Sequence, residues 1–103
     1  MLIRSQRSDV VVESAGSVIK NLPDDTDGDQ HQRFLVRLSS GDMILVAHNI
    51  DLAARVPVDA GDIVRFKGQF QWNDRGGCVH WTHRDPRQHH EDGWVEVNGQ
   101  RFQ

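Results

Sequence analysis

The sequence has no tyrosine, one cysteine, two methionines and only two lysines among its 103 residues. A single cysteine cannot form an internal disulfide, and it excludes the zinc modules that need several thiolate ligands. No apolar run approaches the length of a transmembrane helix, and residues 1–9 lack the apolar core of a signal peptide. These absences predict a cytoplasmic protein that does not enter a membrane.

The charge balance argues against a protein that binds duplex DNA without sequence preference. The net charge is −3 with neutral histidines, whereas proteins that bind duplex DNA without sequence preference carry a basic excess. The basic residues are nevertheless ten arginines and two lysines, and arginine makes forked contacts with carboxylates and phosphates. A local anion site therefore stays open, with a codon bias toward arginine as the alternative explanation.

The length predicts one domain, over residues 10–103, preceded by a flexible N-terminus at residues 1–9. Alternation of apolar and polar residues, broken by glycine and proline, predicts strands rather than helices. The aromatic residues at positions 34, 66, 70 and 72 fall on the inward faces of these strands. Strands are expected at residues 10–20, 31–38, 43–49, 63–72 and 78–82, and the Asn98-Gly99 turn predicts a C-terminal hairpin.

One helical turn is expected between the third and fourth strands, capped by Asp51 and ended by Pro57. Five strands, one helical piece and a terminal hairpin predict a mainly β protein with a small antiparallel barrel of the OB type. An SH3-like barrel is the alternative.

The histidines gather at strand ends, and most of them follow Gly76. His80 and His83 are three residues apart, so on a regular strand they would face opposite sides. They can share one ion only if the chain bends between them, and otherwise only one of them joins the site. His31 and Arg33 begin one strand while His48 ends its expected partner, so these clusters are predicted to approach each other.

Three interpretations of these groups follow. A divalent metal such as zinc would take imidazole and carboxylate ligands, with His48, His80, His83 and His89 as candidates. A metal-dependent phosphodiesterase or nuclease would use a histidine or carboxylate as base, with the catalytic candidates His31, Arg33, His48, Asp51, His80, His83 and Asp85. The third interpretation is a hydrogen-bonded network that closes the barrel without chemistry. Cys78 is interpreted as a small strand residue.

Binding without catalysis is the hypothesis that the sequence favours. OB barrels hold single-stranded nucleic acids or sugars on one sheet face, by aromatic rings and positive charge. The outward face of the longest strand carries Arg65 and Lys67, and Trp81 and Trp94 stand among polar residues. The predicted ligand is single-stranded nucleic acid or another anionic molecule, bound by Arg65, Lys67, Trp81, Arg84 and Trp94.

Several motifs together carry a family resemblance. They include His31-Gln32-Arg33-Phe34, the run from Ala47 to Leu52, and His80-Trp81-Thr82-His83-Arg84-Asp85-Pro86 followed by Gly93-Trp94. With these motifs, the chain from about Gly16 to Phe102 resembles the bacterial domain-of-unknown-function family numbered 3465. The resemblance implies no activity.

Overall fold

The residues that the structure describes form seven strands. The structure is a computed structural model that describes residues 10–73, 76–84 and 92–103. Apolar residues alternate with polar ones along most of these segments, which is the pattern of a half-buried strand. The strands are β1 (Val10–Asp25), β2 (His31–Leu38), β3 (Met43–Asn49), β4 (Ile63–Gln71), β5 (Cys78–His80), β6 (Trp94–Val97) and β7 (Gln100–Phe102).

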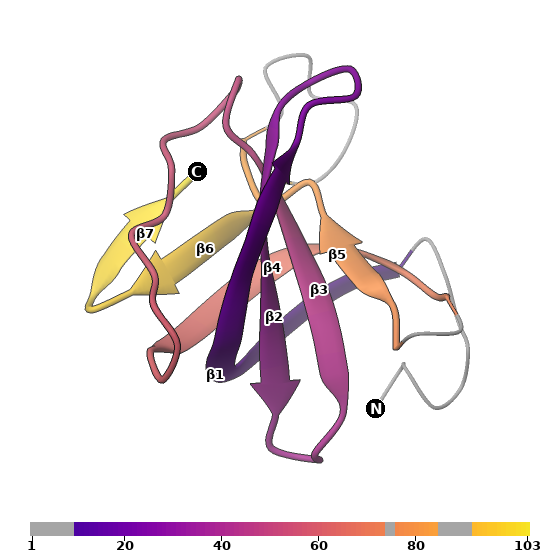
Figure 1. Cartoon of the computed structure of the whole chain (residues 1–103), viewed down its shortest axis with the longest axis vertical. Coiled ribbons are helices and arrows are strands. Elements are labelled where there is room, and N and C mark those ends of the chain that lie inside the picture. The colour runs from indigo at the N-terminus through magenta and orange to yellow at the C-terminus, as the bar shows by residue number, and fades with distance from the viewer. Residues whose placement is uncertain (1–9, 74–75, 85–91) are drawn as a thin grey trace.

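Five of the strands form a ring. They pair in the order β1-β2-β3-β5-β4, and β4 pairs again with β1 to close it (Figure 1). The predicted OB-like barrel is thus confirmed, and its strand pairs are antiparallel except for β3 and β5, which run parallel. A closed ring with an odd number of strands cannot alternate direction throughout, so one pair must be parallel.

The long first strand serves two neighbours. Val10–Ser17 pair with β4 and Gly16–Asp25 pair with β2, so Gly16 marks the bend between them. A Cβ at Gly16 would lie 2.3 Å from the carbonyl oxygen of Arg37, so only glycine allows this approach. β1 also continues to Asp25, beyond the expected end at residue 20, because a register shift between Leu22 and Asp25 accommodates the missing N–H of Pro23.

The core lies inside this ring. The inward residues of β2 and β4 are those that the alternation predicts, and Phe34, Phe66 and Phe70 are almost fully buried. Trp72 is partly buried and packs against them. The predicted core is therefore confirmed.

The segment between β3 and β4 closes the barrel without a helix. The described residues contain no helix, so the helical turn expected at residues 51–57 is absent. The segment begins instead with a non-helical turn that the Asn49 side chain stabilises. The Asn49 side-chain oxygen accepts from the backbone N–H of Asp51 at 2.9 Å and of Leu52 at 3.2 Å. The side chain that holds the start of this segment is therefore Asn49, and not Asp51 as expected. Val56 and Val58 from this segment are buried in the core.

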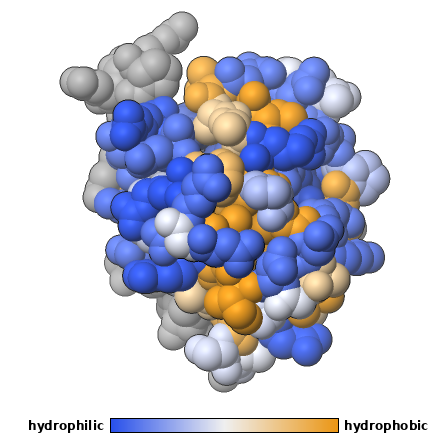
Figure 2. All heavy atoms as spheres, turned by 90° about the vertical axis from the view of Figure 1, so that its left-hand side faces the viewer, coloured by the Kyte–Doolittle hydropathy of each residue, from blue (hydrophilic) through white to orange (hydrophobic). Residues whose placement is uncertain are grey.

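The C-terminal hairpin completes the edge of β4. Gln69–Gln71 pair with β5, while Val64–Lys67 pair with β6 on the other part of the strand. Asn98 and Gly99 have φ values of 53° and 76°, which a two-residue hairpin turn requires. The side with β6 and β7 is mostly hydrophilic, with hydrophobic atoms in a broken band (Figure 2). No helix among the described segments could span a membrane.

Candidate functional site

A groove of about 410 Å³ lies on the outer face of β2 and β3. Its position follows from strand alternation, since residues next to the core positions point outward. Leu35 is in register with Leu45, and Leu22 is in register with Arg33, so these side chains adjoin on one surface. The lining residues are Leu22, Arg33, Leu35, Met43, Leu45, Asn73 and Gly77. The groove thus has an apolar floor and one cationic side chain.

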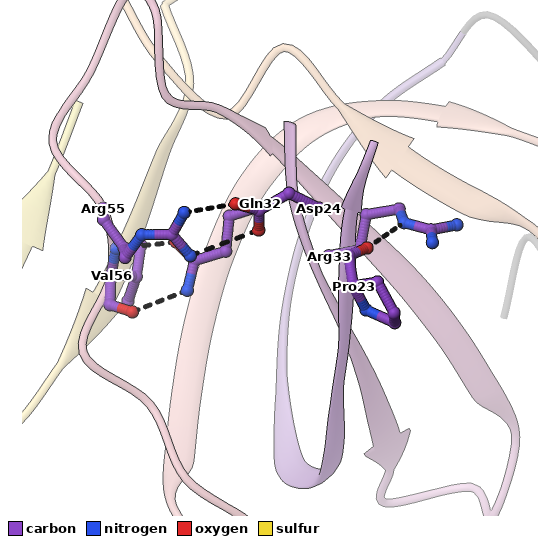
Figure 3. A network of polar contacts seen from close by, with 6 residues as sticks. All are labelled: Pro23, Asp24, Gln32, Arg33, Arg55 and Val56. Atoms are coloured by element: carbon purple, nitrogen blue, oxygen red, sulfur yellow. Dashed lines mark hydrogen bonds and ion pairs between the residues drawn. The ribbon is translucent and has the colours of Figure 1, made fainter. Parts of the chain in front are cut away.

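Arg33 is held in place at the groove by one hydrogen bond. Its Nε donates to the carbonyl oxygen of Pro23 at 2.9 Å, and its side chain lies on the opposite side of β2 from Gln32 (Figure 3). The nearby Asp24 carboxylate is occupied by Arg55, which binds it through two nitrogens and lowers its pKa. No carboxylate within the described residues forms an ion pair with Arg33. A guanidinium placed in this way is chemically able to donate from its terminal nitrogens to an oxyanion.

Cys78 adjoins the groove but is not suited to nucleophilic attack. It is in register with Leu45 across the parallel pair and is half-buried. Burial raises the pKa of its thiol to about 11, against the smaller opposite effect of the Arg33 charge. Since the thiolate is the nucleophile and the metal ligand, Cys78 is a packing residue, as the sequence indicated.

His48 lies inside the barrel and not in the groove. Its Nε2 donates to the carbonyl oxygen of Ala54 at 2.9 Å, so the neutral ring accepts at Nδ1 from the hydroxyl of Thr82, 2.7 Å away. The side chain is fully buried, and burial lowers its pKa below the ordinary value. His48 thus links β3 to Ala54, in the segment after it, and to Thr82, in the segment after β5, so both of its ring nitrogens are hydrogen-bonded.

The chain bends between His80 and His83, at Trp81. β5 ends at His80, and Trp81 has a left-handed backbone with φ of 57°. The alternation of side chains is broken there, so Thr82 and His83 are both buried while His80 is only partly buried. The bend that a shared site of both histidines would require is thus present, one residue before Thr82. His83 joins the interior near His48, whereas His80 stays on the outer face.

The other predicted catalytic and metal residues are separated. His31 pairs in register with Asn49, but it lies on the outer face while its neighbour His48 points inward. Each of three further candidates is hydrogen-bonded to a backbone atom. The Nδ1 atoms of His31 and His83 donate to the carbonyls of Asp29 and Arg84, respectively. The Asp51 carboxylate accepts from the backbone N–H of Gln30. Within residues 10–73, 76–84 and 92–103, no three histidine, cysteine or acidic side chains are placed to share a metal ion. Asp85 and His89 lie outside the described residues.

The predicted ligand-binding residues lie away from the groove or at its margin. Arg65 is 3.6 Å from the Glu13 carboxylate, and both are exposed. Lys67 is half-buried in the middle of β4, and Arg84 is exposed after the bend. Trp81 is 40% exposed, as expected. The expectation of an exposed ring is wrong for Trp94, which is 7% exposed because it begins β6 beside β4 and Arg101 lies 4.0 Å above its ring.

Sequence reasoning missed the two features that shape this region. One is the apolar groove floor, whose signal was Leu35 on the polar face of an alternating strand. The other is Gln32, a buried residue whose side chain donates to the Val56 carbonyl at 2.7 Å and accepts from the Val56 N–H at 2.8 Å (Figure 3). A glutamine on the core face was the signal that a backbone partner had to lie opposite it.

The fold and the groove define the class of protein as a small OB-like barrel with an open outer face. Residues 1–103 match the family model described as "Protein of unknown function (DUF3465)". The chain therefore belongs to this family, and the resemblance carried by its motifs is confirmed over a longer range than they spanned. No curated protein matches the sequence.

Proposed function

We propose that this protein is a binding module that holds an anionic ligand in the groove on β2 and β3. The observation that carries the proposal is Arg33, which is fixed by the Pro23 carbonyl and has no ion-pair partner among the described residues. A guanidinium forms strong, directional hydrogen bonds with phosphate and carboxylate oxygens. The apolar floor next to it suits a ligand that also has an uncharged part.

The location of the groove in the fold supports the same function. Barrels of the OB type bind oligonucleotides and oligosaccharides on the face of their second and third strands, beside the loops after the first and fourth strands. Here the floor comes from β2 and β3, and Asn73 and Gly77 come from the connection between β4 and β5. This support is an analogy between folds, whereas Arg33 belongs to this chain.

The alternative of a metal-dependent hydrolase has no such support. Among the candidate bases, His31, His48 and His83 are each engaged by a backbone carbonyl, and Asp51 accepts from the backbone N–H of Gln30. Binding is therefore the function that the described geometry favours.

The test compares Arg33→Ala with Arg37→Ala. Both arginines point outward from β2, but Arg37 is exposed and lies beyond the groove. The probes are fluorescently labelled oligothymidylate and inorganic polyphosphate, followed by anisotropy at low and moderate salt. Because a hydrogen bond to a charged group contributes about 1.5–3 kcal/mol, Arg33→Ala should weaken binding about ten-fold or more. Arg37→Ala should change it only slightly.

Two results would overturn the proposal. One is the absence of salt-sensitive binding to either anionic probe. The other is equal loss of affinity in the two arginine variants, because the effect would then come from total charge and not from the groove.

A further inference from the structure

Trp81 combines an unfavourable backbone with an exposed ring. A bulky residue at positive φ is an outlier, and its φ of 57° follows directly after the end of β5. The indole is 40% exposed and stacks on the imidazole of His80, with ring centroids 5.2 Å apart and planes at 26°. Glycine or asparagine would adopt this backbone at lower cost. This position therefore combines a steric cost with a large, partly exposed ring, and such an outlier is a starting point for a functional hypothesis.

The surrounding structure holds this backbone in place. Thr82 is fully buried and its hydroxyl is hydrogen-bonded to His48. On the other side, the Gly93 N–H donates to the carbonyl of His83 at 2.9 Å. A Cβ at Gly93 would lie 2.1 Å from the carbonyl oxygen of Trp81, so the two chains are in close contact. These contacts hold the backbone from the Trp81 carbonyl to His83 in place.

The stacked pair shares an outer face with the groove. Cys78 is in register with Leu45 of the groove floor, and His80 is the next outward residue of β5. The order β2-β3-β5 places two strand spacings, about 10 Å, between the strand of Arg33 and the strand of His80. A cationic group and a rigid aromatic surface are therefore separated across one face of the barrel.

We propose that the ligand is single-stranded nucleic acid, with a phosphate at Arg33 and a base stacked on Trp81, which His80 supports from behind. This inference rests on the proposed binding function and specifies its ligand. Stacking on an aromatic side chain accepts every base, and it needs bases that are not paired in a duplex. A polymer that alternates phosphates and flat rings supplies both groups across this face. The ring is preorganised, so little ordering opposes binding.

The experiment uses Trp81→Gly as the main variant and Trp81→Phe as its matched control. Affinities are measured for an oligothymidylate, for an abasic oligomer of the same length and for polyphosphate. Trp81→Gly should weaken oligothymidylate binding about ten-fold or more and leave the other two probes unchanged, whereas Trp81→Phe should retain most of the binding. The melting temperature of Trp81→Gly should stay near that of the wild type. Glycine adopts the left-handed backbone without strain, and this gain offsets the loss of the ring contacts.

A second variant, Trp81→Leu, keeps apolar packing on His80 without an aromatic face and should lose binding in the same way. If Trp81→Gly and Trp81→Leu both bind oligothymidylate like the wild type, the stacking proposal is overturned and the groove function stands. Equal affinity for a duplex, or for a mononucleotide, would also overturn it. Failure of every anionic probe would instead refute the proposed function.

Discussion

Replacing Gln32 by leucine should destabilise the barrel, because two backbone groups of Val56 would lose their hydrogen-bond partners. The Gln32 side chain satisfies both the N–H and the carbonyl of Val56, and the two residues are 5% and 1% exposed. Gln32→Leu keeps a similar volume but leaves both backbone groups without these partners. Each buried group that loses its hydrogen bond costs about 1–3 kcal/mol.

The expected loss can be worked out from these terms. Two unsatisfied groups cost about 2–6 kcal/mol, and the more apolar side chain recovers about 1–2 kcal/mol. The middle of each range leaves a net loss of about 2.5 kcal/mol, which is a substantial part of the stability of a small domain, about 5–15 kcal/mol. At about 4–8 °C per kcal/mol for a domain of this size, the midpoint of thermal unfolding should fall by roughly 10–20 °C.

The assay is thermal and urea unfolding followed by circular dichroism, with Gln71→Leu as the control. Gln71 is exposed on β4, so its replacement should change stability by no more than about 0.5 kcal/mol. Gln32→Glu adds a second check, because a carboxylate cannot donate to the Val56 carbonyl and its protonation restores a donor. Its deficit relative to the wild type should shrink at low pH. A Gln32→Leu variant that melts within about 2 °C of the wild type would refute the reasoning.

Two further predictions concern titrating groups. Burial lowers the pKa of His48 below its ordinary 6.5, so the unfolded chain binds more protons, and stability should be lost as pH falls below that value. Urea unfolding from pH 7.5 to 5 should show a smaller decrease for His48→Gln, and equal slopes would contradict this sign. Burial raises the pKa of Cys78 to about 11, so native protein should react slowly with a thiol reagent at pH 8 and quickly in urea. Fast labelling of the native protein would show that the thiol is accessible.

The barrel was predictable because its strands and turns are specified by short stretches of the sequence. Alternation placed Phe34, Phe66 and Phe70 inside, and the Asn98-Gly99 pair specified its own turn. The parallel pairing of β3 and β5 was not visible in any one segment, since it follows from closing an odd number of strands. The role of Asn49 was also missed, because Asp51 and Asn49 are both good caps and only the path of the chain chooses between them.

The site was harder to predict than the fold because it depends on which residues far apart in sequence share a face. The histidines attracted attention by their type, yet His48 and His83 are buried and hydrogen-bonded to backbone carbonyls. The groove was formed by leucines, whose individual positions look like ordinary strand residues. The sequence singled out Arg33 for a catalytic role, whereas the structure places it at the groove. Only the register of β1 with β2 shows that it adjoins an apolar floor.

The two partners of β1 also affect how the chain is made. Gly16–Asp25 can pair with β2 as soon as β2 itself has been synthesised. Val10–Ser17, in contrast, must wait until Ile63–Phe70 of β4 have been synthesised. At about 5–20 residues per second, the first half of β1 stays without its partner strand for several seconds. Unpaired strand edges are prone to aggregation. Chaperone demand during translation should therefore centre on residues 10–17, and slow codons between Leu38 and Ile63 should lower the yield of soluble protein.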